Sequence, residues 1–189
     1  LFRRHARLDG EFITAAEDQT QWLAEALPSM PRFAPQSKKQ MKDVEFVALL
    51  FLLLEDGPKG YSQEALDEAF TARDSEWDSR NQTVSNFQRA INSVKSIIFS
   101  AQDPKELQGS RLRNQADFYS LVGAVHNLLE ANSPAPFDVA ARSLASFASR
   151  VEVESERLQD SDLMAYFDAA RSASNDKGPR ERRINYMMQ

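Results

Sequence analysis

The sequence predicts an all-α fold, an irregular bundle of about seven to nine helices. Alternation of apolar and polar residues with period two, the pattern of a half-buried strand, is nearly absent, whereas apolar residues recur at three- and four-residue steps along the whole chain. No segment repeats at a fixed period, which argues against a solenoid.

The composition is that of a globular domain. The chain has 189 residues, of which 42% are hydrophobic and 27% charged, enough to bury a substantial core. The absence of cysteine excludes disulfides, thiolate metal sites and cysteine nucleophiles. With His5 and His126 as the two histidines, we expect no catalytic metal and no cofactor. A net charge of −5 argues against a general nucleic-acid binder.

Two parts of the chain are predicted from its prolines. Residues 1–35 are expected to form a small helical piece with a proline-rich connection, and residues 36–189 a helical bundle domain. The first helix is predicted over residues 14–27. Prolines interrupt residues 28–39, "PSMPRFAPQSKK", so we expect a connection there rather than a helix.

The next helix, residues 41–55, is predicted to lie at the centre of the bundle, because apolar residues surround it on nearly every side. It should end at Asp56-Gly57-Pro58, where glycine can take a left-handed cap conformation and proline cannot continue the helix. The apolar run within it, "FVALLFLLL", is about half the length of a membrane span, so no membrane partner is expected.

The rest of the chain shows further amphipathic segments. One stretch, residues 100–115, is polar and broken by Pro104 and Gly109, and it is predicted to be a long loop. The remaining helices are predicted over residues 62–73, 83–99, 118–129, 138 to about 158, 161–172 and 179–188.

The two ends suggest a fragment of a longer protein. The chain begins with leucine, and it stops just after the apolar "INYMM". The first ten residues lack the apolar stretch of a secretory signal, so the cytoplasm is the expected location.

The polar residues of the chain form no recognisable acid–base or nucleophilic motif. The carboxylate groups at residues 67–68 and 152–156 lie in charge-rich helical segments, where a solvated face is favoured over catalysis. His126 falls beside an apolar stripe and is interpreted as structural rather than as a ligand or base. The chain has no "GxSxG" and no glycine-rich phosphate loop, so no catalytic residue is predicted.

The most informative stretch is "SASNDKGPRERR", residues 172–183. If Pro179 takes the first position of the last helix, Ser174, Asn175 and Asp176 precede its N-terminus. Free backbone N–H groups and the helix dipole at such a place favour an anion.

Helical phasing divides the arginines of this stretch. With Ile184 and Met187 on the buried face, Arg180 falls within that face and Arg182 points away. A partly buried Arg180 needs a partner, either an acidic side chain of the bundle or a phosphate, and the internal ion pair is favoured. Arg182 and Arg183 are expected to be more exposed.

Three stretches together resemble a known family: "MKDVEFVALLFLLLEDG", "NFQRAINSVKSIIF" and "YFDAARSASNDKGPRERRI". Their order is similar to that in the helical C-terminal part of the GmrSD-type family, over roughly residues 40–189. The most specific mark is Tyr166-Phe167-x-x-Ala170-Arg171-Ser172 with Asn175-Asp176 and Arg180-x-x-Arg183.

Members of that family join an N-terminal ParB/sulfiredoxin-like domain to a helical region, and they include modification-dependent restriction enzymes and phage-defence proteins. The family's Asp-Gly-Gln-Gln-Arg motif is absent here, because "LDGEF" at residues 8–12 lacks the Gln-Gln-Arg, and no HNH histidines are present. The resemblance therefore implies a non-catalytic domain that packs on a missing N-terminal domain. Its candidate contacts to a nucleotide or DNA backbone are Arg171, Asn175, Arg180 and Arg183.

A second hypothesis is a helical protein–protein interaction or regulatory module of another multidomain protein, in which the same arginines are only structural. An independent enzyme has little support. On its own the chain is expected to bind little or no DNA at physiological salt, because its charge balance is acidic. The oligomeric state is left open.

Overall fold

A computed structural model describes residues 10–28, 30–172 and 174–189. Within these ranges there are eleven α-helices, eight of them seven residues or longer, and no strand, so the all-α prediction is confirmed with slightly more helices than expected. The elements are α2 (Glu11–Ala26), α3 (Pro35–Lys39), α4 (Lys42–Asp56), α5 (Gln63–Ser75), α6 (Arg80–Phe99), α7 (Pro104–Gly109), the 3₁₀ turn η1 (Arg111–Arg113), α8 (Gln115–Glu130), α9 (Phe137–Arg150), α10 (Glu154–Gln159), α11 (Ser161–Arg171) and α12 (Lys177–Met187).

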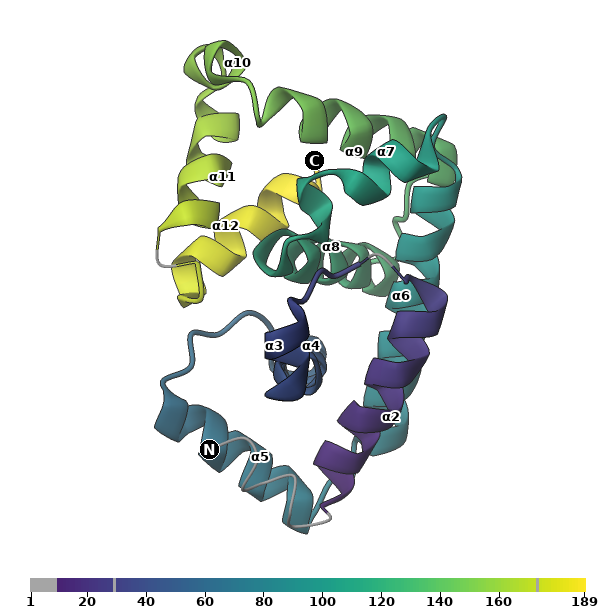
Figure 1. The fold of residues 1–189 in the computed structure, drawn as a ribbon, viewed down its shortest axis with the longest axis vertical. Helices are drawn as coiled ribbons and strands as arrows, with labels where there is room; N and C mark the ends of the chain where they lie inside the picture. The colour runs from purple at the N-terminus through teal and green to yellow at the C-terminus, as the bar shows by residue number, and fades with distance from the viewer. Residues whose placement is uncertain (1–9, 29, 173) are drawn as a thin grey trace.

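The central position of α4 is confirmed. Figure 1 shows it nearly end-on in the middle of the molecule, and it contacts α2, α6 and α8. Nine of its residues are buried, because its apolar side chains point in every direction. It ends at Gly57, whose φ of 74° is the left-handed conformation predicted for this position. In the described ranges no helix is both long enough and apolar enough to cross a membrane.

An aromatic cluster joins the N-terminal helices to α4. The Phe12 ring on α2 lies 4.7 Å from the Trp77 ring and 5.8 Å from the Phe51 ring on α4, centroid to centroid, both with edge-to-face geometry. Phe87 on α6 meets Phe51 from another side, at 5.3 Å. Such pairs add to the stabilisation from burial alone, so α2 packs directly on α4, α5 and α6.

The C-terminal helices α11 and α12 pack on each other, and α12 packs on α8. At the α8–α12 contact, Gly123 faces Ile184, and a Cβ atom added to this glycine would lie 2.8 Å from the Ile184 Cδ1 atom. Since real Cβ contacts are not that short, a residue with a side chain here would force the Ile184 side chain to move.

The prediction of a long loop over residues 100–115 is wrong, because most of this stretch forms α7 and η1. The Asp103 side chain accepts hydrogen bonds from the backbone N–H groups of Lys105 and Glu106, and Pro104 occupies the first helical position. The Ser110 hydroxyl then accepts from Leu112 N–H to start η1. The polar residues that suggested a loop are therefore helix caps.

Two other predicted boundaries also differ. The single helix expected from Asp138 to about Leu158 is two helices, α9 and α10, separated at residues 151–153. Val151 is fully buried at the break, and its carbonyl accepts a hydrogen bond from Arg157 Nη1 at 2.7 Å, which stabilises the change of direction. The connection after α2 contains the short helix α3, with Pro35 at its start.

Candidate functional site

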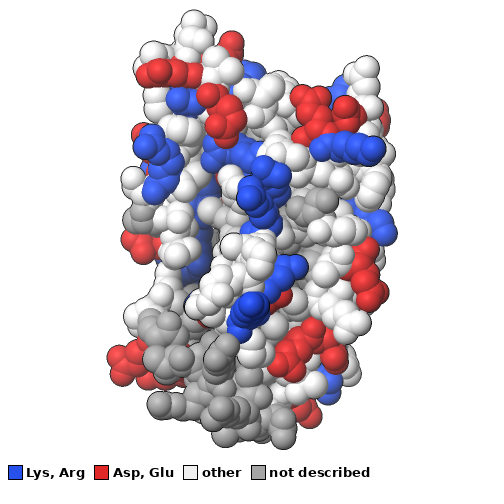
Figure 2. Space-filling view, in the orientation of Figure 1, with Lys and Arg blue, Asp and Glu red and all other residues white. Residues whose placement is uncertain are grey.

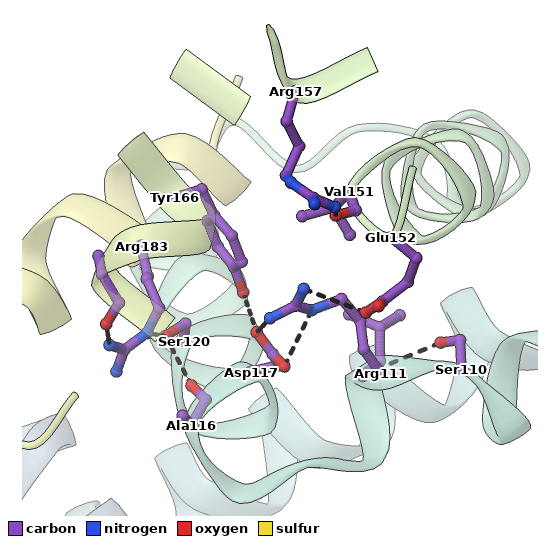
Figure 3. Close-up of polar contacts among 12 residues, drawn as sticks. Ser110, Arg111, Ala116, Asp117, Ser120, Val151, Glu152, Arg157, Tyr166 and Arg183 are labelled. Carbon is purple, nitrogen blue, oxygen red and sulfur yellow. Dashed lines mark hydrogen bonds and ion pairs between the residues drawn. The ribbon is translucent and has the colours of Figure 1, made fainter. Parts of the chain in front are cut away.

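A buried polar cluster lies where η1, α8 and α11 meet (Figure 3). Asp117, in the first turn of α8, has 2% of its side chain exposed and accepts from Arg111 Nε at 3.1 Å and Nη2 at 3.3 Å. The Tyr166 hydroxyl of α11 donates to the same carboxylate at 2.5 Å. A carboxylate in the first turn also interacts favourably with the helix dipole. Asp117 thus anchors two other elements to the start of α8.

The chemistry of this cluster is that of a fixed donor and a fixed acceptor. Burial raises the pKa of Tyr166 well above its ordinary value, and the charge of Asp117 raises it further. The phenol therefore keeps its proton and donates it in a hydrogen bond. Arg111 reaches the surface through Nη1, which binds Glu152 at 3.2 Å. The cluster therefore stabilises the packing of η1 and α11 on the start of α8.

Arg183 is fully buried, so the expectation that it would be more exposed is wrong. Its Nε donates to the Ser120 hydroxyl at 2.9 Å, and its two terminal nitrogens donate to the carbonyls of Ala169, at 2.6 Å, and Ser174, at 2.9 Å. Burial lowers the pKa of this guanidinium. Arg183 lies three residues after Arg180 and four before Met187, and this spacing could have placed it on the buried face.

Arg180 is buried, as predicted, with 5% exposed, but its partner differs from both predictions. Its Nη1 donates to the backbone carbonyl of Lys59 at 2.5 Å, and its guanidinium carbon lies 4.5 Å from the centre of the Tyr119 ring. A carbonyl and a ring face therefore take the place of the expected carboxylate or phosphate. Nearby, a Cβ atom on Gly60 would lie 3.1 Å from the backbone nitrogen of Lys177, so the loop after α4 runs directly against the start of α12.

The other two predicted contact residues, Arg171 and Asn175, are exposed. The Arg171 guanidinium lies over the Phe167 ring, 5.1 Å from its centre. Asn175 precedes α12, which begins at Lys177, so Pro179 occupies the third helical position rather than the predicted first. The structure thus places the four predicted residues in two settings, two buried within the helices and two at the surface. Arg182 is exposed, as predicted.

Of the two histidines, the structure describes His126. His5 lies outside the described residues. His126 is buried on α8, its Nδ1 has no hydrogen-bond partner in the described part of the chain, and burial lowers its pKa. Neutral imidazole in an apolar setting fits the structural interpretation. Nowhere in the described ranges do three or more metal-ligating side chains come together.

Sequence reasoning missed a second carboxylate that joins helices, the partly buried Glu55 at the end of α4. Its Oε1 atom accepts from Trp77 Nε1 and the Ser79 hydroxyl at 2.7 Å each and from the Thr83 hydroxyl at 2.5 Å, and its Oε2 accepts from Arg73 Nε at 2.6 Å. Burial alone would raise the pKa of Glu55, but the four donated hydrogen bonds outweigh it and lower the pKa. One signal was available: Glu55 follows an uninterrupted apolar run, where a charge needs a partner.

The charged surface is uneven. Figure 2 shows Lys and Arg side chains in a band over the middle of one face, above α3 and η1, with acidic side chains to either side. Lys38 and Lys39 belong to α3 and Arg113 to η1, and the backbone N–H of Arg32 donates to the Arg113 carbonyl at 2.7 Å, which holds these segments together. On an acidic chain, this band is where a polyanion would meet the least repulsion.

An apolar groove runs between α9 on one side and α8 with the C-terminal end of α12 on the other, and we call it the α8–α9 groove. Its larger part has a volume of about 550 Å³ and an adjoining part about 320 Å³. On its α9 side, Phe137 is 44% exposed and Val139 41%. Both parts share the wall residues Ile97, Val125, Leu128, Ala135 and Ala140.

The groove exists because α9 packs on α6 and α7 and leaves α8 partly uncovered. Leu144 and Phe147 of α9 are buried and line the groove, while Met187 and Met188 line its far end. In Figure 1 the C-terminus lies between α8 and α9, in agreement with these contacts. Local periodicity could not have predicted a groove whose walls come from four separate helices.

A scan against protein-family models, a search of curated proteins and a search of solved structures found no match to this chain.

Proposed function

We propose that the chain is a non-catalytic helical domain of a larger protein, and that it acts by binding a protein segment in the α8–α9 groove. The observation that carries this proposal is the groove itself, an open apolar surface bounded by exposed Phe137 and Val139. Concave apolar surfaces that remain open in one chain are typical of protein-binding sites.

The buried charged groups also support a binding role. Arg183, Asp117 and Glu55 each direct their polar atoms to partners in the same chain, so they hold helices in position. This use of the arginines is what the interaction-module hypothesis predicts.

For the identity of the larger protein, the GmrSD-type resemblance is the candidate that the sequence marks favour. In that setting the chain would pack on a ParB-like domain in the cytoplasm. Arg171 and Asn175, both exposed, are then the contacts proposed for a nucleotide or DNA backbone. Arg180 and Arg183 are buried and bound to the carbonyls of Lys59 and Ala169, which argues against a contact to such a ligand through them.

A photo-crosslinking amino acid at Val139 tests the groove in the intact protein inside its own cell. We expect one defined crosslinked segment, identified by mass spectrometry, and no defined product from the same probe at Phe99, which is exposed and apolar but lies outside the groove. A segment from a ParB-like domain of the same chain would support the GmrSD-type identity, and a segment from another protein would support the regulatory module. Equal, diffuse labelling at both positions would contradict the groove as a docking site.

Nucleotide and DNA binding of the intact protein tests the ligand contact. If the domain acts through the groove alone, folded Arg171→Ala and Arg180→Ala variants bind as the parent does, with Arg182→Ala as the matched exposed control. A loss of nucleotide or DNA binding in Arg171→Ala alone would instead support a contact between Arg171 and the ligand's phosphates.

A further inference from the structure

The charged residues that line the α8–α9 groove have one sign. Among the described lining residues, the charged side chains are Arg142 and Arg150, both on α9. They are eight residues apart, which corresponds to about 12 Å along the helix axis. The groove thus offers an apolar floor with two cations along one edge.

Both arginines keep donors for a further partner. Arg142 is 70% exposed and shares Nη1 with Asp138 at 2.9 Å. Arg150 is 41% exposed and shares Nε with Glu156 and Nη2 with Asp160. Those carboxylates are not among the described residues of the groove wall. Because a guanidinium carries five N–H donors, each arginine can also bind a carboxylate that enters from the groove.

From this arrangement, and given that the groove is a docking site, we propose that it holds an amphipathic helix of a partner protein, whose apolar stripe is flanked by two carboxylates about 12 Å apart. The apolar stripe contacts the groove floor, and the carboxylates bind Arg142 and Arg150. Met187 and Met188 at the far end adapt to the shape of the partner's side chains, since unbranched thioether side chains repack easily.

Two other occupants are distinguished from a partner helix. A peptide that binds as an added β-strand needs an open sheet edge, and the part of the chain that the structure describes contains no strand. A second copy of this chain would associate in a concentration-dependent way, which the test below detects.

Two synthetic helical peptides test the proposal on the whole chain. Both carry the same leucine stripe, and they differ only at two flanking positions eight residues apart, which are Glu in one peptide and Lys in the other. We expect the Glu peptide to bind about ten-fold more tightly in fluorescence anisotropy. In the double variant Arg142→Gln, Arg150→Gln this preference should disappear, whereas it should persist in Arg182→Gln, an exposed control outside the groove.

Other outcomes overturn the proposal in distinguishable ways. Equal binding of both peptides, abolished by Val139→Asp, would keep the groove as a docking site and refute the acidic partner. A Glu preference that survives in the double variant would place acid recognition elsewhere. Concentration-dependent association that Val139→Asp reverses would make a second copy the occupant. Failure of both peptides to bind, with circular dichroism showing the chain folded, would also refute the proposal, while the crosslinking at Val139 tests the proposed function separately.

Discussion

Glu55 and Asp117 are both nearly buried carboxylates that join helices, yet they join different kinds of segments. The donors to Glu55 on α4 all come from residues 73–83, the end of α5 and the start of α6. Asp117 instead binds Arg111 just before α8 and Tyr166, 49 positions further along the chain. Glu55 therefore organises one turn against the central helix, whereas Asp117 holds α11 in place.

Glu55 and Tyr166, the phenol bound to Asp117, make the stability of the protein depend on pH in opposite ranges. The pKa of Glu55 is lowered, so its contribution to stability is present above the unfolded value and is lost as pH falls. The pKa of Tyr166, the partner of Asp117, is raised, so its contribution is present below the unfolded value and is lost as pH rises. Substitutions in the Glu55 cluster and in the Asp117 cluster test this difference.

The largest effect is expected from Asp117→Ala. This change leaves the Arg111 guanidinium, 8% exposed, without its main counter-ion and removes the acceptor of the Tyr166 hydroxyl. The free energy of unfolding should fall by about 4 kcal/mol, measured by urea denaturation. Adding Arg111→Met should recover part of this loss, because the buried charge is removed as well. A double variant as unstable as the sum of the single changes would contradict the coupling.

An intermediate effect is expected from Glu55→Gln, which keeps the volume and removes the charge. The free energy of unfolding should fall by about 2 kcal/mol at pH 7, because the bonds from two hydroxyls, an indole and a guanidinium to the carboxylate are weakened together. The parent protein should lose stability as pH falls below the ordinary value of 4.5, and the variant should not show this step. Identical pH profiles of parent and variant would contradict a pKa of Glu55 that is lowered by folding.

The smallest effects are expected from removing one hydroxyl donor to Asp117 and one hydroxyl donor to Glu55. Tyr166→Phe should cost about 1.5 kcal/mol and Thr83→Val about 1 kcal/mol, because Thr83 is one of four donors to its carboxylate. Thermal unfolding between pH 8 and 11 should also separate them. The parent and Thr83→Val should lose stability as pH rises past the ordinary tyrosine pKa of 10, and Tyr166→Phe should lose less.

Features that depend on local spacing could be predicted from the sequence. The all-α class, the central helix with its Gly57 cap and the burial of Arg180 follow from periodicity or turn chemistry within a few residues. The burial of Arg183 was not predicted, although its spacing from Arg180 and Met187 places it on the same buried face. The partners of Glu55 and Asp117 and the groove could not be predicted, because they depend on which helices meet.

The contact between Gly123 and Ile184 determines when the packing around α8 can be completed during synthesis of the chain. A ribosome releases the chain from its N-terminus, so α8 emerges well before the residue that packs against its glycine. Until residue 184 has been synthesised, that side of α8 has neither Ile184 nor Arg183 to cover it. The nascent chain therefore completes the packing around α8 only at the very end of this stretch of translation.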